Sequence, residues 1–412
     1  MPQKKENGAQ ETGLSDHKRI GWEQNLFLIS QEVGSGLPMF APKGLILRRQ
    51  IEQYITQEKE QRGYSFVWTP HIGKVDLYKK SGHWQKYDAM FTPMKIDDEQ
   101  YVLKPMNCPH HFQIYLERPR SYRELPLRIA ENGTVYRYEK SGEVNGLLRA
   151  RALTQDDSHN FVRHDQIADE IEKVLDLMET VYKTFGFNQY KARISVRNPK
   201  DKKKYIGSDQ IWKQAEQALI QVAKKRGIEY FIGEGEAAFY GPKIDVVVND
   251  SLGREWQLTT CQLDFNQPEN FDLVYTDEQG KKARPAILHI AILGSIERFM
   301  GVYIEHVGGA FPLWLAPEQV WVLPISEKLN GFAQSIASQL KGIRTVVRTE
   351  NESLGKKIRE GELQKIPYLL VIGEKEQQQG TISVRKRGQK EVKEMKLETF
   401  LNTIAEEITT KI

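Results

Sequence analysis

Long apolar runs and cysteines are both scarce in this chain of 412 residues. The longest notable apolar run, Ala286–Gly294, is interrupted by His289 and is far shorter than the roughly 20 residues of a membrane span. Two cysteines, Cys108 and Cys261, provide no disulfide framework, which fits a reducing cytoplasm. The start, Met1–Leu14, is polar and lacks a secretory signal pattern. We therefore expect a cytoplasmic protein without a membrane segment.

A strong charge of one sign is also absent. Lys and Arg number 59 and Asp and Glu 55, a net charge of +4 that does not by itself indicate nucleic-acid binding. Residues 311–412 hold 16 basic and 13 acidic side chains, so most of the excess lies in the last quarter. With 39% hydrophobic residues, the composition is that of an ordinary globular protein, long enough for two or three domains.

No Gly-x-x-x-x-Gly-Lys sequence occurs, which excludes a P-loop for nucleotide binding. Gly233, Gly235 and Ala238 match the letters of a dinucleotide fingerprint. However, Tyr240-Gly241-Pro242 follows where that fold needs the start of a helix, so we reject this interpretation.

The first three quarters of the chain predict an α+β domain. Apolar residues at three- and four-residue steps predict a helix over 44–63, and a short strand is expected at 65–70. Two further helices are expected at 164–185 and 208–226. Partly alternating runs bounded by Gly, Asn and Asp suit an antiparallel sheet, with strands expected at 101–106, 125–139, 147–154, 244–250 and 254–265.

The pattern changes near residue 311, after which strands and helices alternate. Strands are expected at 320–325, 344–348, 368–372 and 381–386, and helices at 329–340, 353–364 and 397–412. This alternation predicts a small α/β domain with a parallel core over 311–412. Residues 17–310 then form the first domain, and 1–16 a flexible tail.

Three clusters carry residues suited to chemistry: 106–111, 136–139 with 149–159, and 288–298. Each also has an ordinary interpretation: a small buried cysteine, a solvated hairpin, and a core helix with one satisfied histidine. The second cluster places arginines on both sides of a Gly-containing loop between two strands. Arginine forks suit phosphate oxygens, and Glu139 can accept a hydrogen bond from an adenine amino group. Such a hairpin can bind ATP without a P-loop.

These segments resemble the three motifs of class II aminoacyl-tRNA synthetases: 36–70, the strand–loop–strand with Arg137 and Glu139, and the strand–helix junction at Gly294 and Arg298. The strings MNCPHH, TQDDSH, AAFYGPKID, TCQLDF and LGSIER are similar to threonyl-tRNA synthetases, from about Asp16 to the end. The resemblance implies a class II antiparallel-sheet catalytic domain at 17–310 and an α/β anticodon-binding domain at 311–412. It also implies ATP-dependent activation of L-threonine, transfer to the 3′ end of tRNA(Thr), and a homodimer.

The resemblance implies one zinc ion per subunit, held by Cys108, His159 and His289. Three protein ligands leave a coordination position open, where threonine's amino and hydroxyl groups can bind but valine cannot complete the shell. A local pairing of Cys108 with His111 is the alternative. The threonine pocket is expected to contain Met106, Gln155, Asp157, Tyr240, Thr260 and Gln262. Asp157 would anchor the amino group, unless it is a helix cap or a surface ion-pair residue.

For ATP, which would bring Mg²⁺, the resemblance assigns the α-phosphate to Arg137 and the γ-phosphate end to Arg149 and Arg298. Glu139 and Gln257 match adenine and ribose contacts, Lys243 lines the site, and Leu153 faces the adenine. The expected catalytic residues are Arg137, Arg298, Lys243 and His83.

His83 matches a histidine near the terminal ribose of tRNA, where it could act as a general base, although a lone histidine is often structural. Anticodon contacts are expected from Asn351, Arg359, Glu376 and Arg385, although the run 385–387 also reads as a solvated strand end.

Four residues depart from the usual pattern: His110, Leu153, Thr259 and Ile290. Bacterial relatives usually carry an N-terminal and an editing domain before this core, whereas about 16 residues precede it here. Serine lacks only a methyl group, worth about 1–3 kcal/mol. We therefore expect detectable serine activation, with seryl-tRNA cleared by another protein in trans if the chain is not truncated. A non-catalytic RNA-binding paralogue and a zinc hydrolase remain alternative functions.

Overall fold

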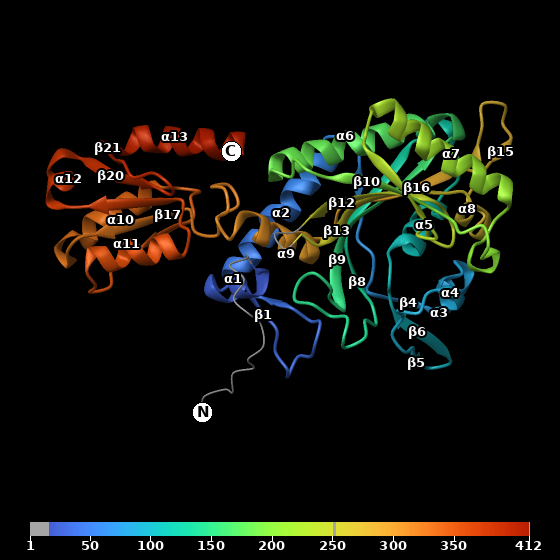
Figure 1. The fold of residues 1–412 in the computed structure, drawn as a ribbon, viewed down its shortest axis with the longest axis horizontal. Coiled ribbons are helices and arrows are strands. Elements are labelled where there is room, and N and C mark those ends of the chain that lie inside the picture. Colours follow the sequence, from blue (N-terminus) through green and yellow to red (C-terminus); the bar gives the residue numbers. More distant parts are fainter. Residues whose placement is uncertain (1–15, 250–252, 412) are drawn as a thin grey trace.

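The computed structural model describes residues 16–249 and 253–411. Figure 1 shows a larger body built around a wide twisted sheet and a smaller α/β body, joined by the segment after α9. The predicted tail at 1–16 lies outside the described residues except for Asp16, whose side chain caps the first turn of α1 (His17–Glu23). Among the described helices, none combines the length and apolar character that crossing a membrane requires.

The larger body contains an eight-stranded sheet in the order β11-β10-β12-β13-β16-β9-β8-β3. All neighbours pair antiparallel except β10 with β11 and β3 with β8. The α+β fold class is therefore confirmed. The strands are β3 (Ser65–Phe66), β8 (Leu127–Tyr136), β9 (Ala152–Val162), β10 (Lys191–Val196), β11 (Tyr230–Glu234), β12 (Lys243–Asn249), β13 (Glu255–Asp264) and β16 (Ala286–Ser295).

Long amphipathic helices cover the sheet. In α6 (Ile167–Phe185), buried residues recur at helical spacing, and a left-handed Gly186 ends the helix. Fully burying one such aliphatic side chain stabilises the fold by roughly 1.5–3 kcal/mol. The other helices of this body are α2 (Pro42–Glu60), α3 (Val75–Lys80), α4 (His83–Lys86), α5 (Cys108–Leu116), α7 (Asp209–Arg226), α8 (Gln267–Asn270) and α9 (Ile296–Val307).

Three small sheets complete the larger body. One pairs β1 (Phe27–Leu28) with β2 (Met39–Phe40). The order β4-β6-β5 forms another, and β15-β14-β7 the third. Their strands are β4 (Ile72–Lys74), β5 (Met94–Ile96), β6 (Glu99–Leu103), β7 (Arg120–Ser121), β14 (Tyr275–Thr276) and β15 (Lys282–Ala283).

The smaller body has a five-stranded sheet in the order β18-β17-β19-β20-β21. Its first three strands are parallel, which confirms the predicted parallel core. The strands are β17 (Val320–Pro324), β18 (Thr345–Val347), β19 (Tyr368–Ile372), β20 (Thr381–Lys386) and β21 (Val392–Lys396). The helices are α10 (Asn330–Gln339), α11 (Leu354–Leu363), α12 (Glu374–Gln379) and α13 (Leu397–Thr410). The sequence did not predict α12 or β21.

In the larger body, one predicted strand and one alternative interpretation were wrong. The strand expected at 147–154 begins only at Ala152, because Leu147 and Leu148 are buried anchors of a loop rather than alternating strand residues. The Leu147 amide donates to His17 Nε2, which ties this loop to α1. The interpretation of 288–298 as one core helix fails because residues up to Ser295 form β16, whose first eight residues are all buried. A strand buried on both faces lacks the alternation that identifies strands.

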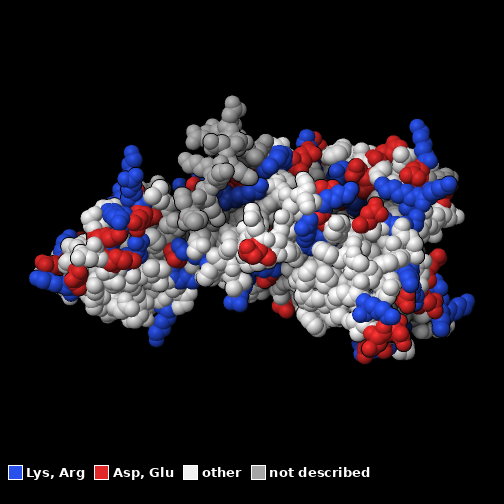
Figure 2. All heavy atoms as spheres, turned by 90° about the horizontal axis from the view of Figure 1, so that it is seen from below, with Lys and Arg blue, Asp and Glu red and all other residues white. Residues whose placement is uncertain are grey.

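The segment after α9 is fixed to both bodies. Phe311, Trp314 and Leu315 pack in the core of the larger body. Arg344 of the smaller body donates hydrogen bonds of 2.8 Å to the carbonyls of Trp314 and Ala316. On the face drawn in Figure 2, acidic and basic side chains are interspersed over both bodies, in keeping with the small net charge.

Candidate active site

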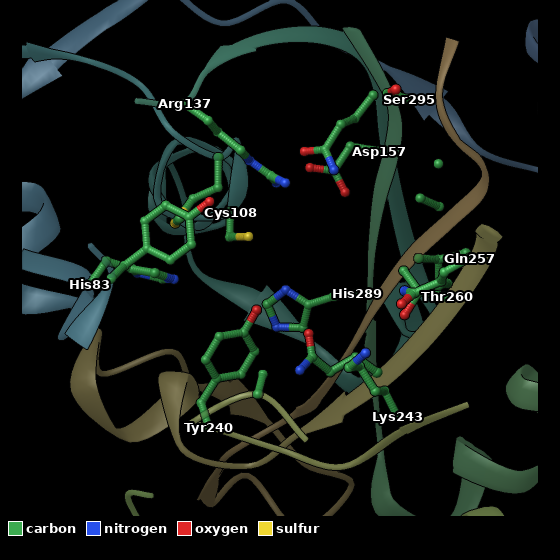
Figure 3. A pocket seen from close by; sticks show the side chains of 18 of the residues that line it. His83, Cys108, Arg137, Asp157, Tyr240, Lys243, Gln257, Thr260, His289 and Ser295 are labelled. Carbon is green, nitrogen blue, oxygen red and sulfur yellow. The ribbon is translucent and has the colours of Figure 1, made fainter. Parts of the chain in front are cut away.

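A cavity of about 660 Å³ opens over β13 and the neighbouring strands β9 and β16. It brings together residues from distant parts of the sequence (Figure 3). The predicted site residues that line it are His83, Met106, Cys108, Arg137, Leu153, Gln155, Asp157, Tyr240, Lys243, Gln257, Thr260, Gln262, His289 and Arg298.

Cys108, His159 and His289 form a buried group whose ligand atoms all lie within 4.8 Å of one another. His159 and His289 are direct partners in the register of β9 and β16, and Cys108 begins α5. Nε2 of His159 lies 3.0 Å from Nδ1 of His289. Burial lowers the pKa of His159 and raises that of the Cys108 thiol. A thiol and two imidazoles at these separations could hold a metal ion.

The alternative pairing of Cys108 with His111 is not found. His111 lies behind His159, with its Nδ1 2.8 Å from Nδ1 of His159 and its Nε2 3.2 Å from Glu131 Oε2. His111 therefore contacts the outer side of one histidine of the group.

Asp157 faces the cavity from within β9, so it is neither a helix cap nor a surface residue. Its Oδ2 accepts a hydrogen bond of 3.0 Å from Asn107 Nδ2. Opposite, the ring of Tyr240 lies 5.1 Å from that of His289, and Figure 3 shows its hydroxyl and the Cys108 sulfur pointing to the same space. This end of the cavity can hold a small molecule with an ammonium group beside the Cys-His-His group.

Asp245 of β12, which the sequence did not single out, organises the neighbouring wall. Its carboxylate is fully buried and forms an ion pair with Lys243. Four more donors reach it: Ser195 Oγ (2.8 Å), Arg193 Nη2 (3.2 Å), Gln257 Nε2 (2.7 Å) and Thr260 Oγ1 (2.9 Å). Three of the predicted site residues thus depend on one carboxylate, and only the contacts of the folded sheet reveal it.

Two guanidinium groups line the cavity: Arg137, which Figure 3 shows pointing into it between Cys108 and Asp157, and Arg298 of α9. Within the described residues, no carboxylate lies within 4.0 Å of Arg137 or Arg298. Burial, reinforced by Arg137 and Arg149, lowers the pKa of Arg298 to about 10. Arg149 forms an ion pair with Glu139, at 2.7 Å from Nη2 to Oε2. Clustered, partly desolvated cations of this kind make a site for a polyanion.

Arg298 owes its place to a bulge in β16. Pairing with β9 shifts between Ala291 and Ser295, and Gly294 adopts φ +79°. The buried carboxylate of Asp156 accepts hydrogen bonds of 2.9–3.0 Å from the amides of Ile292, Leu293 and Gly294. Lys59 of α2 forms an ion pair of 3.2 Å with it. The sequence did not predict the roles of Asp156 and Lys59, because their ion pair exists only in the folded chain.

His83 lines the cavity at the start of α4 and is only 3% exposed. Ser81 Oγ donates to the Tyr78 carbonyl, so it accepts a hydrogen bond of 2.7 Å from His83 Nδ1. This contact leaves Nε2 of His83 without a proton. Burial, with a smaller effect of His289, lowers the pKa of His83 to about 3, so the ring is neutral at physiological pH.

The four residues that depart from the usual family pattern lie in different parts of the larger body. Leu153 and Ile290 line the cavity. Thr259 is buried, with its hydroxyl 2.6 Å from the Ile292 carbonyl oxygen. His110 packs against β4, where a Cβ at Gly73 would lie 3.2 Å from its ring.

The predicted anticodon residues lie in the smaller body, away from the cavity. Asn351 lies just before α11 and Arg359 lies within it, and both residues are exposed. Glu376 accepts a 2.9 Å hydrogen bond from the Gly373 amide, and Arg385 of β20 lies 3.6 Å from Glu362. Glu376 and Arg385 therefore also make contacts within the smaller body.

Comparison with known proteins agrees with this geometry. Residues 91–307 match the tRNA synthetase class II core domain family (G, H, P, S and T), and residues 319–407 match the anticodon binding domain family. A solved threonyl-tRNA synthetase structure from Cryptosporidium parvum, titled as its RNA binding domain, is 36% identical. It superimposes with a TM-score of 0.90 over 95% of this chain and 98% of that one. The chain belongs to the threonyl-tRNA synthetase family of class II.

Other members of the family are also similar. A threonyl-tRNA synthetase structure from Aeropyrum pernix, described as putative, is 32% identical, with a TM-score of 0.85 over 96% of each chain. The threonine–tRNA ligase of Chloroherpeton thalassium is 50% identical over 410 residues, which are 98% of this chain and 62% of the relative. The chain thus spans about three fifths of the length of the curated relatives it matches. These matches confirm the resemblance found in the sequence and the order of the two folds.

Proposed function

We propose that this chain is a threonine–tRNA ligase that activates L-threonine with ATP and transfers it to tRNA(Thr). One observation carries the proposal. A single cavity has a Cys-His-His group beside a carboxylate at one end and Arg298 toward the other, with Arg137 near enough to both Cys108 and Arg298 to shift their pKa values. An amino acid and a nucleoside triphosphate bound at these two ends would meet in the middle, as adenylate formation requires.

Zinc fits the first end, and Cys108, His159 and His289 would hold it. The donor set supports this choice, since a thiol with two imidazoles is a zinc set that leaves a fourth position open. Zinc bound there would engage the amino and hydroxyl groups of threonine and so disfavour valine.

The remaining residues of this end would bind and orient threonine. Asp157, held by Asn107, would accept hydrogen bonds from the substrate ammonium group. Its neighbours would shape the pocket around the side chain: Met106, Gln155, Tyr240, Thr260 and Gln262.

The other end would hold ATP with Mg²⁺. Arg137 would bind the α-phosphate, where negative charge develops as a threonine carboxylate oxygen attacks phosphorus and pyrophosphate leaves. Arg149 and Arg298 would hold the γ-phosphate end. Glu139, Gln257 and Leu153 would contact the nucleoside, and Lys243 would line the site.

In the transfer step, the unprotonated Nε2 of His83 would accept the proton of the attacking ribose hydroxyl. The smaller body would read the anticodon through Asn351, Arg359, Glu376 and Arg385, and two chains would form a homodimer. Serine, which lacks only a methyl group, would be activated more weakly than threonine.

Amino-acid-dependent ATP–pyrophosphate exchange tests the proposal. We expect exchange with threonine, less with serine and none with valine, and loss of all exchange after chelation of zinc. Restored exchange on adding back zinc controls for damage by the chelator. Zinc-loaded protein that shows no exchange would favour the non-catalytic RNA-binding paralogue. Amino-acid-independent hydrolysis would favour the zinc hydrolase.

A further inference from the structure

The ring nitrogen of His289 that points away from the Cys-His-His group, its outer nitrogen, faces a carboxylate. Nε2 of His289 lies 2.9 Å from Oδ2 of Asp264, which is fully buried. The other oxygen of Asp264 accepts hydrogen bonds from the amides of Asn266 (2.7 Å) and Gln267 (3.0 Å). A carboxylate that already binds amide donors acts as an acceptor, so His289 carries its proton on Nε2. Its Nδ1 then presents a lone pair to the Cys-His-His group.

The outer nitrogen of His159 faces a second histidine instead. Its Nδ1 lies 2.8 Å from Nδ1 of His111, and Nε2 of His111 lies 3.2 Å from Oε2 of Glu131. His111 and His159 are fully buried and Glu131 is 3% exposed. A hydrogen bond between two Nδ1 atoms needs a proton on one of them only, and the partner of His111 decides which one.

Glu131 is itself held as an acceptor. Its two oxygens accept hydrogen bonds from the Thr69 amide (2.7 Å) and the Thr69 hydroxyl (2.8 Å). Lys104 Nζ lies 3.7 Å from Oε1 and donates a 2.7 Å hydrogen bond to Thr69 Oγ1. With only donors around Glu131, His111 must donate through Nε2. Its Nδ1 then accepts, and His159 carries its proton on Nδ1.

We propose that His111 and Glu131 are positioning residues that select the tautomer of His159 with its Nε2 lone pair directed at the metal. The inference rests on the proposed zinc function and deepens it. Both inner nitrogens, His159 Nε2 and His289 Nδ1, then lack protons although they lie 3.0 Å apart. Two facing lone pairs with no proton between them attract a cation, and unprotonated inner nitrogens are the state that zinc binding requires.

The two histidines are supported differently, which makes the relay testable. His289 has a direct carboxylate partner, whereas His159 reaches one only through the ring of His111. Loss of an outer partner of a metal-bound histidine costs about 10–100-fold in metal affinity. His111→Leu removes the acceptor, while His111→Asn can keep an oxygen near the position of Nδ1. Glu131→Gln introduces an amide whose donors oppose those of Thr69.

The experiment measures zinc affinity of the full chain by competition with a chromophoric chelator, and zinc per chain by mass spectrometry. We expect about one zinc per wild-type chain, about 10–100-fold weaker binding in His111→Leu and Glu131→Gln, and near wild-type affinity in His111→Asn. His110→Asn, on the neighbouring position of α5, is the matched control and should bind zinc like the wild type. Unaltered affinity in folded His111→Leu would overturn the proposal.

A second measurement does not depend on any variant folding. Long-range ¹H–¹⁵N correlation spectra of zinc-free wild-type protein report which nitrogen of each histidine is protonated. We expect His159 protonated on Nδ1 and His111 on Nε2, and the opposite tautomer of His159 would overturn the relay. Failure of the wild type to bind zinc would instead overturn the proposed function, and the tautomers would still report on the hydrogen-bond chain.

Discussion

Asn107 donates a hydrogen bond of 3.0 Å to Asp157 and so fixes the carboxylate that faces the Cys-His-His end of the cavity. Asn107 is fully buried just before α5. Gly133 of β8 leaves the space it occupies, since a Cβ there would lie 2.5 Å from Asn107 Nδ2. The amide can therefore adopt few other positions, and Asp157 is held by packing as well as by its hydrogen bond.

Replacing Asn107 should impair threonine binding selectively. Asn107→Leu keeps the volume but removes the donor to a charged acceptor, a loss of about 1.5–3 kcal/mol. We expect the KM for threonine to rise roughly 10–100-fold in ATP–pyrophosphate exchange, while the KM for ATP stays within a factor of about two. An equal rise in both constants would contradict a specific role for this contact.

Asp245→Asn should disable the wall that carries Lys243, Gln257 and Thr260. The amide cannot accept all five donors, so we expect exchange activity to fall at least about 100-fold and the melting temperature to decrease. Ser195→Ala removes one donor outside the cavity lining and should retain most activity. Comparable losses in both variants would show that the network acts only on stability.

Pyrophosphate alone should stabilise the protein thermally. It would neutralise Arg137 and Arg298, which have no carboxylate within 4.0 Å among the described residues. Binding to the folded state raises stability by RT ln(1 + [L]/Kd), about 2.7 kcal/mol at one hundred times Kd. We expect a concentration-dependent rise in melting temperature by scanning fluorimetry, reduced in Arg298→Gln. Chloride at equal ionic strength is the control, and an equal rise with chloride would argue against a specific site.

Gly294→Ala should both destabilise the fold and reduce activity. Gly294 has φ +79°, and an added Cβ would lie 2.7 Å from the Leu258 carbonyl oxygen, so the backbone before Arg298 must move. The left-handed conformation alone costs an alanine about 1–2 kcal/mol. Gly331→Ala in α10, where a Cβ meets no atom within 4 Å, should instead be neutral or stabilising. Chemical denaturation and pyrophosphate exchange of the two variants test this contrast.

Folding stability should fall as the pH drops below about 6.5, in part because of His83. Its pKa is lowered to about 3 by burial and by His289, so the folded form stays neutral while the unfolded chain takes up a proton. The stability due to this difference is complete above pH 6.5, and about 2 kcal/mol of it is lost by pH 5. Ser81, Tyr87 and Tyr240 also face the ring, and none of them ionises in this range. His83→Asn should flatten the decrease in melting temperature from pH 7 to 5, and an unchanged slope would refute this contribution.

Local pattern predicted much of the fold. Strand β19, a short apolar run, and strand β20, whose burial alternates, have the predicted bounds, and α6 follows its apolar stripe. Strands β10 and β11 escaped prediction, and β16 was expected only as the strand of the junction at Gly294 and Arg298, because a wholly buried strand lacks a distinctive period.

The Cys-His-His group could be expected only through resemblance to a family. His159 and His289 lie 130 residues apart and become neighbours through strand register, which no local spacing encodes. The supporting residues Asp156, Asp245 and Glu131 were missed for a related reason. A buried carboxylate with several donors looks in sequence like any acidic residue, and its role arises from contacts made after folding.

One continuous element, β16 followed by α9, carries both His289 and Arg298 (Figure 1). The separation of these two residues is therefore set by the number of residues between them and by the bulge between Ala291 and Ser295. Side chains along this element can differ from the family's usual residues without altering that separation, as Ile290 illustrates. An insertion or deletion within the element would move Arg298 relative to the Cys-His-His group and so change the distance between the proposed threonine and ATP sites.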